Sequence, residues 1–109
     1  MRFLVIIEGV PGGPPTPPEQ MAPLVQATFD WAKRMKESGR SEIQYAMADH
    51  AGGLMGGFCI HNVESAEQLA EDLATMPLGT LSTFKVYPLV TMEASQKIFE
   101  GMLAQLVKK

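Results

Sequence analysis

The chain has 109 residues, a net charge of −3 and a hydrophobic content of 46%, which predicts one soluble globular domain spanning residues 1–109. This acidic balance lacks the basic surface that nucleic-acid binding requires, and no apolar run approaches the ~18 residues needed to span a bilayer. A single cysteine, Cys59, excludes an internal disulfide, and no secretory signal is visible. We therefore expect a cytoplasmic protein with no nucleic-acid and no membrane partner.

The first part of the chain predicts a strand, a proline-rich loop and a helix. The apolar run Phe3–Ile7 is typical of a strand that is buried on both faces. Segment 10–18 contains five prolines and two glycines, so it can continue neither a strand nor a helix interior. It is expected to be a stiff loop, mobile or lid-like over Val10–Thr16. Because Pro23 would cost about 3 kcal/mol in a helix interior, we expect the main helix to begin at about Ala22.

The middle of the chain predicts a β-hairpin. Glu42–Met47 alternates with period two, Asp49–Gly53 is a turn signal, and Leu54–Val63 forms the third strand. The pair Gly56-Gly57 inside that strand indicates a bulge, or a place where another group approaches the backbone closely.

The remaining elements are a helix, a strand and a final helix. Ser65–Gln68 is a capping box that opens a helix, which ends at Pro77. Phe84–Leu89 predicts the fourth strand, and Pro88 within it indicates a sheet edge or a strand end. A helix follows from Thr91, with an apolar stripe made of Ile98, Phe99, Met102, Leu103 and Leu106.

The order β-α-β-β-α-β predicts an α+β fold of the ferredoxin-like class, extended by a C-terminal helix. In that arrangement two helices cover one face of the sheet and leave the other face bare. A first strand that is apolar on both faces would then expose one set of its side chains to water. Sheet-to-sheet packing of two copies removes the exposure, so we expect a homodimer, with the terminal helix as a second covering element.

Four segments of the sequence resemble the muconolactone isomerase-like family of the dimeric α/β barrel superfamily. They are Arg2–Glu8, Ala51–Gly53, Cys59–Leu69 and Met76–Leu89, so the resemblance covers about residues 1–90, mostly through structural motifs. It implies two face-packed sheets and a pocket between sheet and helices. Superfamily members include cofactor-free isomerases, polyketide-type cyclases, quinone-forming monooxygenases and haem-degrading enzymes. The chain departs from the pattern in its long Pro/Gly loop, in a first helix poor in acidic residues and at His61, where an apolar residue is expected.

Three residues are candidates for catalysis. His61 would move a proton, since its unperturbed pKa lies near 6.5, and Tyr45 would donate a hydrogen bond to a developing oxyanion. Asp30 stands at the position where the family carries a helix carboxylate. The alternatives are a core histidine with one hydrogen bond and a tyrosine that merely packs. We further expect His61 to border a ligand-accessible pocket, together with the lining residues Trp31, His50, Phe58, Cys59 and Tyr87.

Three functions remain open from the sequence. The first is a cofactor-independent enzyme, isomerase- or cyclase-like, that moves a proton next to a carbonyl or lactone of a small molecule; a cofactor-free monooxygenase is the second enzymatic choice. The second is a non-catalytic dimeric module that binds a ligand or a protein. The third is haem or metal binding through His61, although no cluster has metal-ligand spacing and we expect no cofactor.

Overall fold

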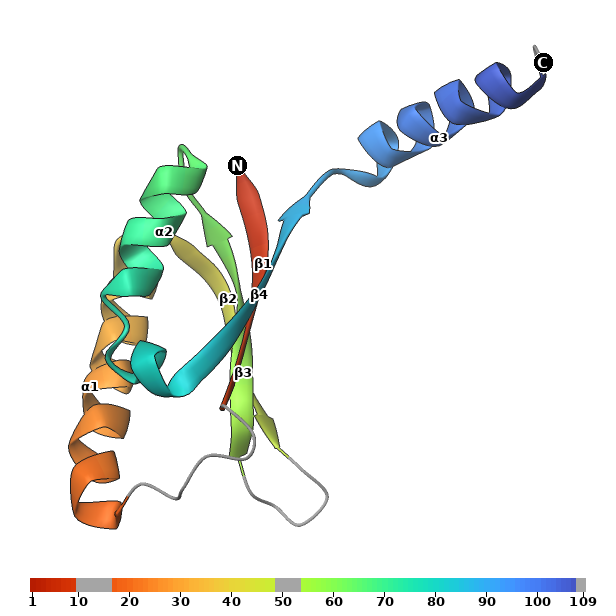
Figure 1. Ribbon diagram of the computed structural model, residues 1–109. Coiled ribbons are helices and arrows are strands. Elements are labelled where there is room, and N and C mark those ends of the chain that lie inside the picture. The colour runs from red at the N-terminus through yellow and green to blue at the C-terminus, as the bar shows by residue number, and fades with distance from the viewer. Residues whose placement is uncertain (10–16, 49–53, 108–109) are drawn as a thin grey trace.

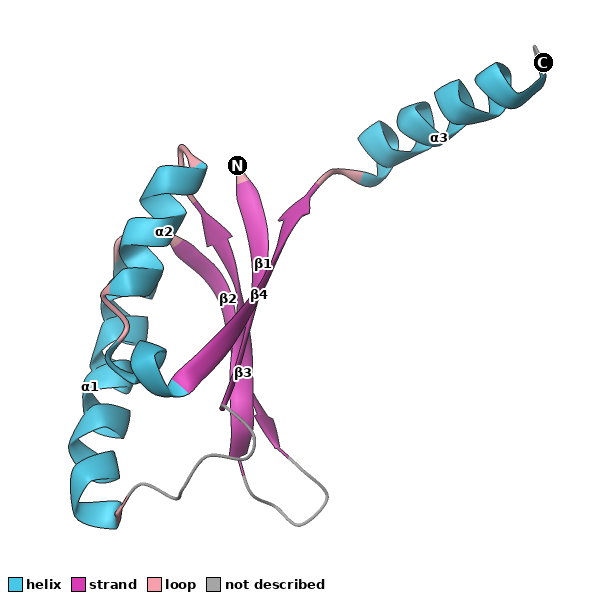
Figure 2. Ribbon diagram, viewed as in Figure 1, coloured by secondary structure: helices cyan, strands magenta, loops and turns pink. Residues whose placement is uncertain are grey.

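The structure is a computed structural model that describes residues 1–9, 17–48 and 54–107. Four antiparallel strands form one sheet in the order β2-β3-β1-β4, with β1 at Arg2–Gly9, β2 at Ser41–Ala48, β3 at Leu54–Asn62 and β4 at Ser82–Leu89. Helices α1, Pro18–Glu37, and α2, Ala66–Ala74, cover one face of this sheet (Figures 1 and 2). The short 3₁₀ helix η1, Pro77–Leu81, leads into β4, and α3, Met92–Val107, follows it. The chain therefore has the predicted ferredoxin-like α+β fold with a C-terminal helix.

The core lies between the two helices and the sheet. Phe3 and Val5 of β1 pack there against Cys59 of β3, with Val63 and Leu69 completing the buried cluster. The pairing register places Val5 opposite Cys59, which puts both side chains on the helix-covered face. Alternate residues of every strand then point to the other face.

That other face of the sheet is apolar and, within the described residues, has no helix over it (Figure 1). Strand alternation and the pairing register place on it, besides Met47 and the charged Arg2, Glu8 and Lys85, these eight apolar side chains: Leu4, Ile6, Ile43, Tyr45, Phe58, Ile60, Tyr87 and Leu89. Tyr45 is 65% exposed and stacks on Phe58, with ring centroids 5.6 Å apart. We call these eight residues the open face.

Helix α1 begins earlier than predicted, at Pro18 instead of about Ala22. Pro18 occupies the first helical position, where the missing N–H has no intrahelical partner in any case. Pro23 lies inside the helix and removes one hydrogen bond, but the helix continues through it. The boundary prediction was wrong because it weighed the cost of this one proline without the packing of α1 along the sheet, which stabilises the whole helix.

Gly56 of β3 has a backbone conformation and a close neighbour that both require glycine. Its φ of +154° is unfavourable for other residues, and an added Cβ would collide with the Ile7 carbonyl of β1. The β2–β3 register is also irregular between Met47 and Ala48. Both forms of the prediction, an irregular ladder and a close backbone approach, are thus confirmed. Pro88 likewise lies on β4, which is an edge strand as predicted.

Helix α2 begins with the predicted capping box. Ser65 is the N-cap and its hydroxyl accepts a hydrogen bond from the Gln68 N–H at 3.1 Å, while the Gln68 side chain accepts one from the Glu64 N–H at 2.9 Å. We expect Ser65→Ala to lower the free energy of unfolding by about 1 kcal/mol, measured from urea denaturation midpoints. Ser95→Ala, at an exposed position of α3, is the control and should leave the midpoint unchanged. Equal midpoints for parent and Ser65→Ala would mean that this cap does not stabilise the fold.

Helix α3 projects away from the rest of the chain (Figure 1). The predicted apolar stripe is present but exposed; Phe99, for example, is 60% exposed. The hydroxyl of Thr91 accepts a hydrogen bond from the Ala94 N–H and so caps the helix start. The predictions for the Val10–Thr16 loop and the Asp49–Gly53 turn lie outside the described residues.

Candidate functional site

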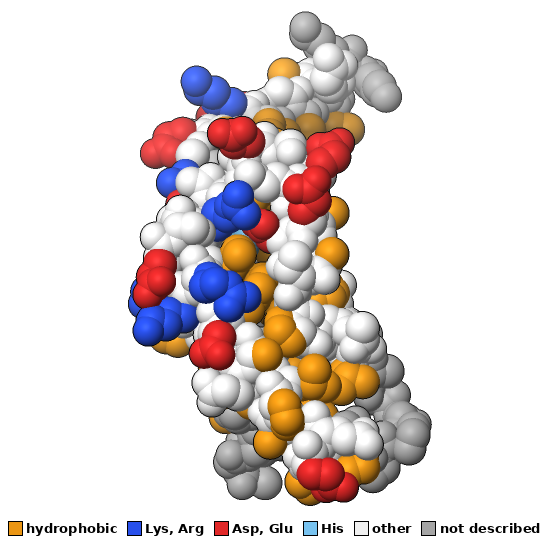
Figure 3. All heavy atoms as spheres, turned by 90° about the vertical axis from the view of Figure 1, so that its left-hand side faces the viewer, with side chains coloured by type: hydrophobic (Ala, Val, Ile, Leu, Met, Phe, Trp, Pro, Cys, Tyr) orange, Lys and Arg blue, Asp and Glu red, His pale blue; other side chains and the backbone are white. Residues whose placement is uncertain are grey.

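A cavity of about 550 Å³ lies between α1 and the sheet. Its walls come from β1, α1, β2, β3 and the segment around η1, and they are mostly hydrophobic. Seen from the helix side, hydrophobic side chains gather over the lower half of the molecule, whereas charged side chains are concentrated in the upper half (Figure 3). A space of this volume and character suits a small, largely apolar ligand.

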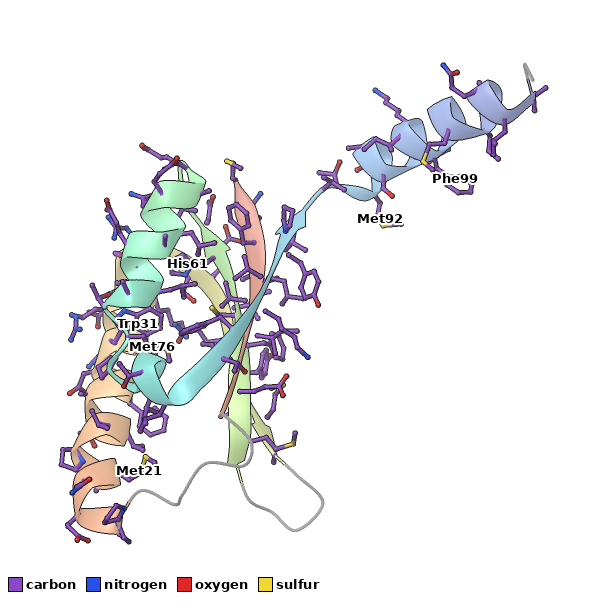
Figure 4. The ribbon with its side chains drawn as sticks, in the orientation of Figure 1. Met21, Trp31, His61, Met76, Met92 and Phe99 are labelled. Carbon is purple, nitrogen blue, oxygen red and sulfur yellow. The ribbon has the colours of Figure 1, made fainter. Side chains whose placement is uncertain are left out.

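Two features of the sequence keep this cavity open. Gly57 of β3 borders it on the helix-covered face, two residues before Cys59, and contributes no side chain, so the sheet leaves room there. Met21 of α1 and Met76 before η1 border it with flexible thioether side chains, which adapt to irregular shapes. Trp31 and Met76 lie close together between the helices and the sheet, and Met21 lies nearer the start of α1 (Figure 4).

Trp31 is the rigid part of the cavity wall. It is the buried residue of α1, only 4% exposed, and its indole Nε1–H donates to the Thr75 hydroxyl at 2.9 Å and to the Asp72 carbonyl at 3.2 Å. These contacts join α1 to the end of α2. The indole therefore has a fixed orientation, with one edge anchored and its ring against the cavity.

Behind Trp31 lies a buried polar cluster formed by His61, Asp72 and Arg40. The His61 imidazole is parallel to the indole within 3°, with ring centroids 6.5 Å apart, and it is fully buried. Its Nε2 lies 2.8 Å from Asp72 Oδ2, and Arg40 donates to Asp72 Oδ1 at 2.7 Å. Asp72 is thus held on both oxygens, by one buried ring and by one half-exposed guanidinium.

This arrangement determines which ring nitrogen of His61 is free. An ionised carboxylate only accepts hydrogen bonds, so a neutral His61 carries its proton on Nε2 and presents a bare Nδ1. Nδ1 has no partner among the described residues, and neither has Ser41 Oγ, which is also buried. Ser41 is the register partner of His61 across β2 and β3. Two unpartnered polar atoms therefore occupy neighbouring positions on the helix-covered face.

Cys59 connects the cluster to the cavity. It borders the cavity and lies two residues from His61 on the same face of β3. Burial raises the pKa of the Cys59 thiol, and the nearby Ser41 hydroxyl partly offsets that rise. Ser41 Oγ nevertheless has no hydrogen-bond partner among the described residues, so it forms no hydrogen bond with the thiol. At neutral pH the thiol is therefore protonated.

The predicted site residues are only partly brought together. Trp31 and Cys59 border the cavity. His61 was expected to border it as well, but the structure places it behind Trp31, fully buried and hydrogen-bonded to Asp72. Tyr45 and Phe58 lie on strand segments that border the cavity, yet strand alternation directs both rings to the open face, where they stack.

Two further candidates lie away from the cavity. Asp30 is on the exposed side of α1, where its carboxylate accepts a hydrogen bond from Gln26. Tyr87, opposite Leu4, is half-exposed on the open face and does not border the cavity. Sequence alone placed these residues on a helix or strand without determining which face would meet the pocket. His50 lies outside the described residues.

The sequence analysis missed two residues of the cluster, Arg40 and Asp72, and its neighbour Ser41. Asp72 carried a usable signal, because it falls three residues after Leu69 and four before Met76 on the inward stripe of α2. A carboxylate at such a position needs a buried partner. The sequence did not reveal that this partner is His61, because the two side chains meet only after α2 packs on the sheet.

Residues 1–9, 17–48 and 54–107 contain neither a metal-ligand cluster nor a membrane-spanning helix. No three histidine, cysteine or acidic residues in these ranges form a group that could hold a metal ion. None of the helices found there is long and apolar enough to cross a bilayer.

Comparison with known proteins relates the chain to others by structure and not by sequence. No family model matches it, and no curated protein matches it in sequence. A solved structure of muconolactone isomerase superimposes with a TM-score of 0.71 and 22% identity, covering 84% of this chain and 90% of that one. The 5-chloro-2-hydroxyhydroquinone dehydrochlorinase of Burkholderia phenoliruptrix AC1100, in complex with 2,5-dihydroxybenzoquinone, superimposes with a TM-score of 0.67 and 16% identity, covering 86% and 98%. The resemblance seen in the sequence therefore extends to three dimensions: the chain has the muconolactone isomerase-like fold.

Proposed function

We propose that this protein is a cofactor-independent enzyme that moves a proton next to a carbonyl or lactone group of a small molecule. The observation that carries the proposal is the apolar cavity of about 550 Å³ with a histidine–carboxylate pair directly behind its wall. The two structural neighbours are named as an isomerase and a dehydrochlorinase, and the second was solved with a small quinone bound. Similarity of fold is only an analogy for function, so the site itself has to support the activity.

The site supplies what such chemistry needs. An apolar cavity excludes water and strengthens electrostatic interactions within it, which favours abstraction of a proton from carbon. The pair His61–Asp72 resembles the arrangement in which a carboxylate orients an imidazole and stabilises its protonated form. Trp31 separates the pair from the cavity and holds a flat apolar surface against the ligand.

We further propose that the protein acts as a homodimer whose subunits pack through their open faces. Eight large apolar side chains gather on one side of the sheet, and apolar patches of this kind mark interaction sites on soluble proteins. A second copy offers an identical surface, as a two-fold interface requires. The exposed apolar stripe of α3 lies beyond the sheet and would find cover on the partner in the same assembly.

A non-catalytic dimeric binding module is the second candidate. It is favoured by the exposed stripe of α3, which has the i, i+4 spacing of a helix that docks in a groove. A module that binds only through its surface needs no open space under α1. The cavity favours the enzyme on this criterion, whereas the burial of His61 away from the ligand favours the module.

The enzyme is tested by proton exchange, an assay that works before the substrate is identified. The protein is incubated in deuterated water with a panel of enolisable lactones and cyclic ketones, and NMR follows the loss of the carbon-bound proton. We expect catalysed exchange for at least one compound. His61→Gln, which keeps a donor toward Asp72 but carries no titratable proton, should slow that exchange by about 100-fold, the low end for general acid–base catalysis.

The control is Glu71→Gln, an exposed position on α2 beside Asp72, which should retain the parent rate. His61→Phe is less suitable than His61→Gln, because it would leave Asp72 Oδ2 without its partner. Binding of panel compounds without any exchange would favour the module, and full exchange activity in His61→Gln would remove His61 from the mechanism.

A further inference from the structure

The position of His61 raises a chemical problem, because the imidazole is fully buried and does not border the cavity. A proton that leaves a ligand cannot reach Nε2, which is engaged with Asp72 at 2.8 Å. The other nitrogen, Nδ1, is free, and the residue opposite it across the strand pair is Ser41. A route from the cavity to His61 would therefore end at Nδ1, and of the two residues opposite His61 in the sheet, Phe3 and Ser41, only Ser41 carries a polar side chain.

Ser41 and Cys59 complete such a route. Directly opposed residues on paired strands have Cβ atoms about 5 Å apart, so the Ser41 hydroxyl is within a side-chain rotation, or one bridging water, of His61 Nδ1. Cys59 lies two residues before His61 on the same face of β3, so it is the diagonal neighbour of Ser41 across the strand pair, and the Ser41 hydroxyl lowers the pKa of its thiol. Cys59 is the residue of the three that borders the cavity.

We propose that Cys59, Ser41 and His61 form a proton relay, with the Cys59 thiol as its cavity end and Asp72 as the support of the imidazole. This inference rests on the proposed function, because the relay makes Cys59 the residue that exchanges protons with the ligand. The donor and acceptor types agree with this assignment: S–H donates to the serine oxygen, the serine O–H donates to Nδ1, and Nε2–H donates to the carboxylate.

The step balances without any further reactant. The thiol proton passes to Ser41 Oγ as the Ser41 proton passes to His61 Nδ1, leaving a thiolate at the cavity and an imidazolium beside Asp72. The thiolate takes a proton from the carbon next to the ligand carbonyl, and the resulting thiol returns it to a second carbon. Reversal of the relay then restores the thiol and the neutral imidazole, so no electron is gained or lost.

The charges around His61 favour this direction of transfer. From α2, Asp72 faces Nε2 and stabilises the imidazolium, and Arg40 faces the other oxygen of Asp72 from the end of α1. The residues that face the ring from α1 and β1, Trp31 and Phe3, are not titratable. Cys59 is the titratable neighbour on its own strand. Burial raises the pKa of its thiol and so opposes the thiolate, and the Asp72 carboxylate has to offset this by stabilising the imidazolium.

The relay is tested through the reactivity of the thiol, since Cys59 is the only cysteine in the sequence. Intact-mass spectrometry measures the rate of alkylation by iodoacetamide between about pH 6 and pH 10, and only the thiolate reacts. We expect Ser41→Ala and His61→Gln each to slow alkylation at pH 7 by about tenfold, equivalent to one pKa unit of the thiol. The double variant should react no more slowly than either single variant, because both substitutions interrupt the same relay.

Three further measurements make the result decisive. Ser41→Thr, which keeps the hydroxyl, should react within about twofold of the parent, and Ser38→Ala, an exposed hydroxyl at the end of α1, should not differ from it. Because burial raises the pKa of the thiol, the measurements are then extended above pH 10 until the parent rate reaches its plateau, where the rates of all variants should converge. A ratio that is still unchanged at this plateau reflects altered access instead of ionisation and overturns the relay, as does an unchanged rate in Ser41→Ala.

These outcomes separate the relay from the proposed function. Slower alkylation in the variants together with full proton exchange in His61→Gln would leave the relay standing and reject the enzyme mechanism. Loss of exchange in His61→Gln with unchanged alkylation in Ser41→Ala would reject the relay alone.

Discussion

Asp72→Ala should lower the free energy of unfolding by about 3 kcal/mol, the cost of leaving a buried charged or polar partner uncompensated. Most of this cost comes from His61, which is fully buried and has Asp72 as its hydrogen-bond partner. Arg40 contributes less, because its side chain is 41% exposed and water can replace the lost contact. The measurement is the urea denaturation midpoint with the slope checked for change.

Two further variants of α2 show whether the loss of stability is specific to the Asp72 carboxylate. Glu71→Ala removes an exposed carboxylate next in the chain and should change stability by less than about 0.5 kcal/mol. Asp72→Asn keeps one oxygen as an acceptor and should fall between the parent and Asp72→Ala. An Asp72→Ala protein as stable as the parent would show that the cluster behind Trp31 does not contribute to folding.

Ile60→Asp should convert the protein from a dimer to a monomer at micromolar concentration. Ile60 lies on the open face between Leu4 of β1 and Ile43 of β2, so it would be central to a sheet-to-sheet interface. A two-fold interface contains each residue twice, and two unpaired carboxylates in an apolar contact should weaken association by at least about 100-fold. Light scattering should give about twice 11.9 kDa for the parent and about 11.9 kDa for the variant.

The matched control is Ala70→Asp, which places the same charge on an exposed position of α2. It should leave the dimer intact, and circular dichroism should show that both variants remain folded. A parent that is a stable folded monomer would contradict the proposed assembly, and so would an Ile60→Asp variant that still forms the dimer.

Local patterns in the sequence were sufficient to predict the elements and their order. The capping box at Ser65, the edge position of Pro88 and the close approach at Gly56 were all readable, because the residue type that each feature requires stands in the local sequence: a capping serine, a strand proline and a strand glycine. The start of α1 was not predicted correctly. Its proline at Pro23 is unfavourable locally, and the packing that compensates it comes from a sheet formed by distant residues.

The candidate site shows the limit of such patterns most clearly. Sequence alternation placed Cys59 and His61 on the same face of one strand, and this is a property of the chain itself. The pairing of His61 with Asp72, the contact of Arg40 with the same carboxylate 32 positions away and the hydrogen bond from Trp31 to Thr75 across 44 positions exist only after α1 and α2 pack on the sheet. Strand periodicity determined which residues share a face, but only the tertiary structure decided which of them meets the cavity, because a cavity forms between elements whose relative positions no local pattern specifies.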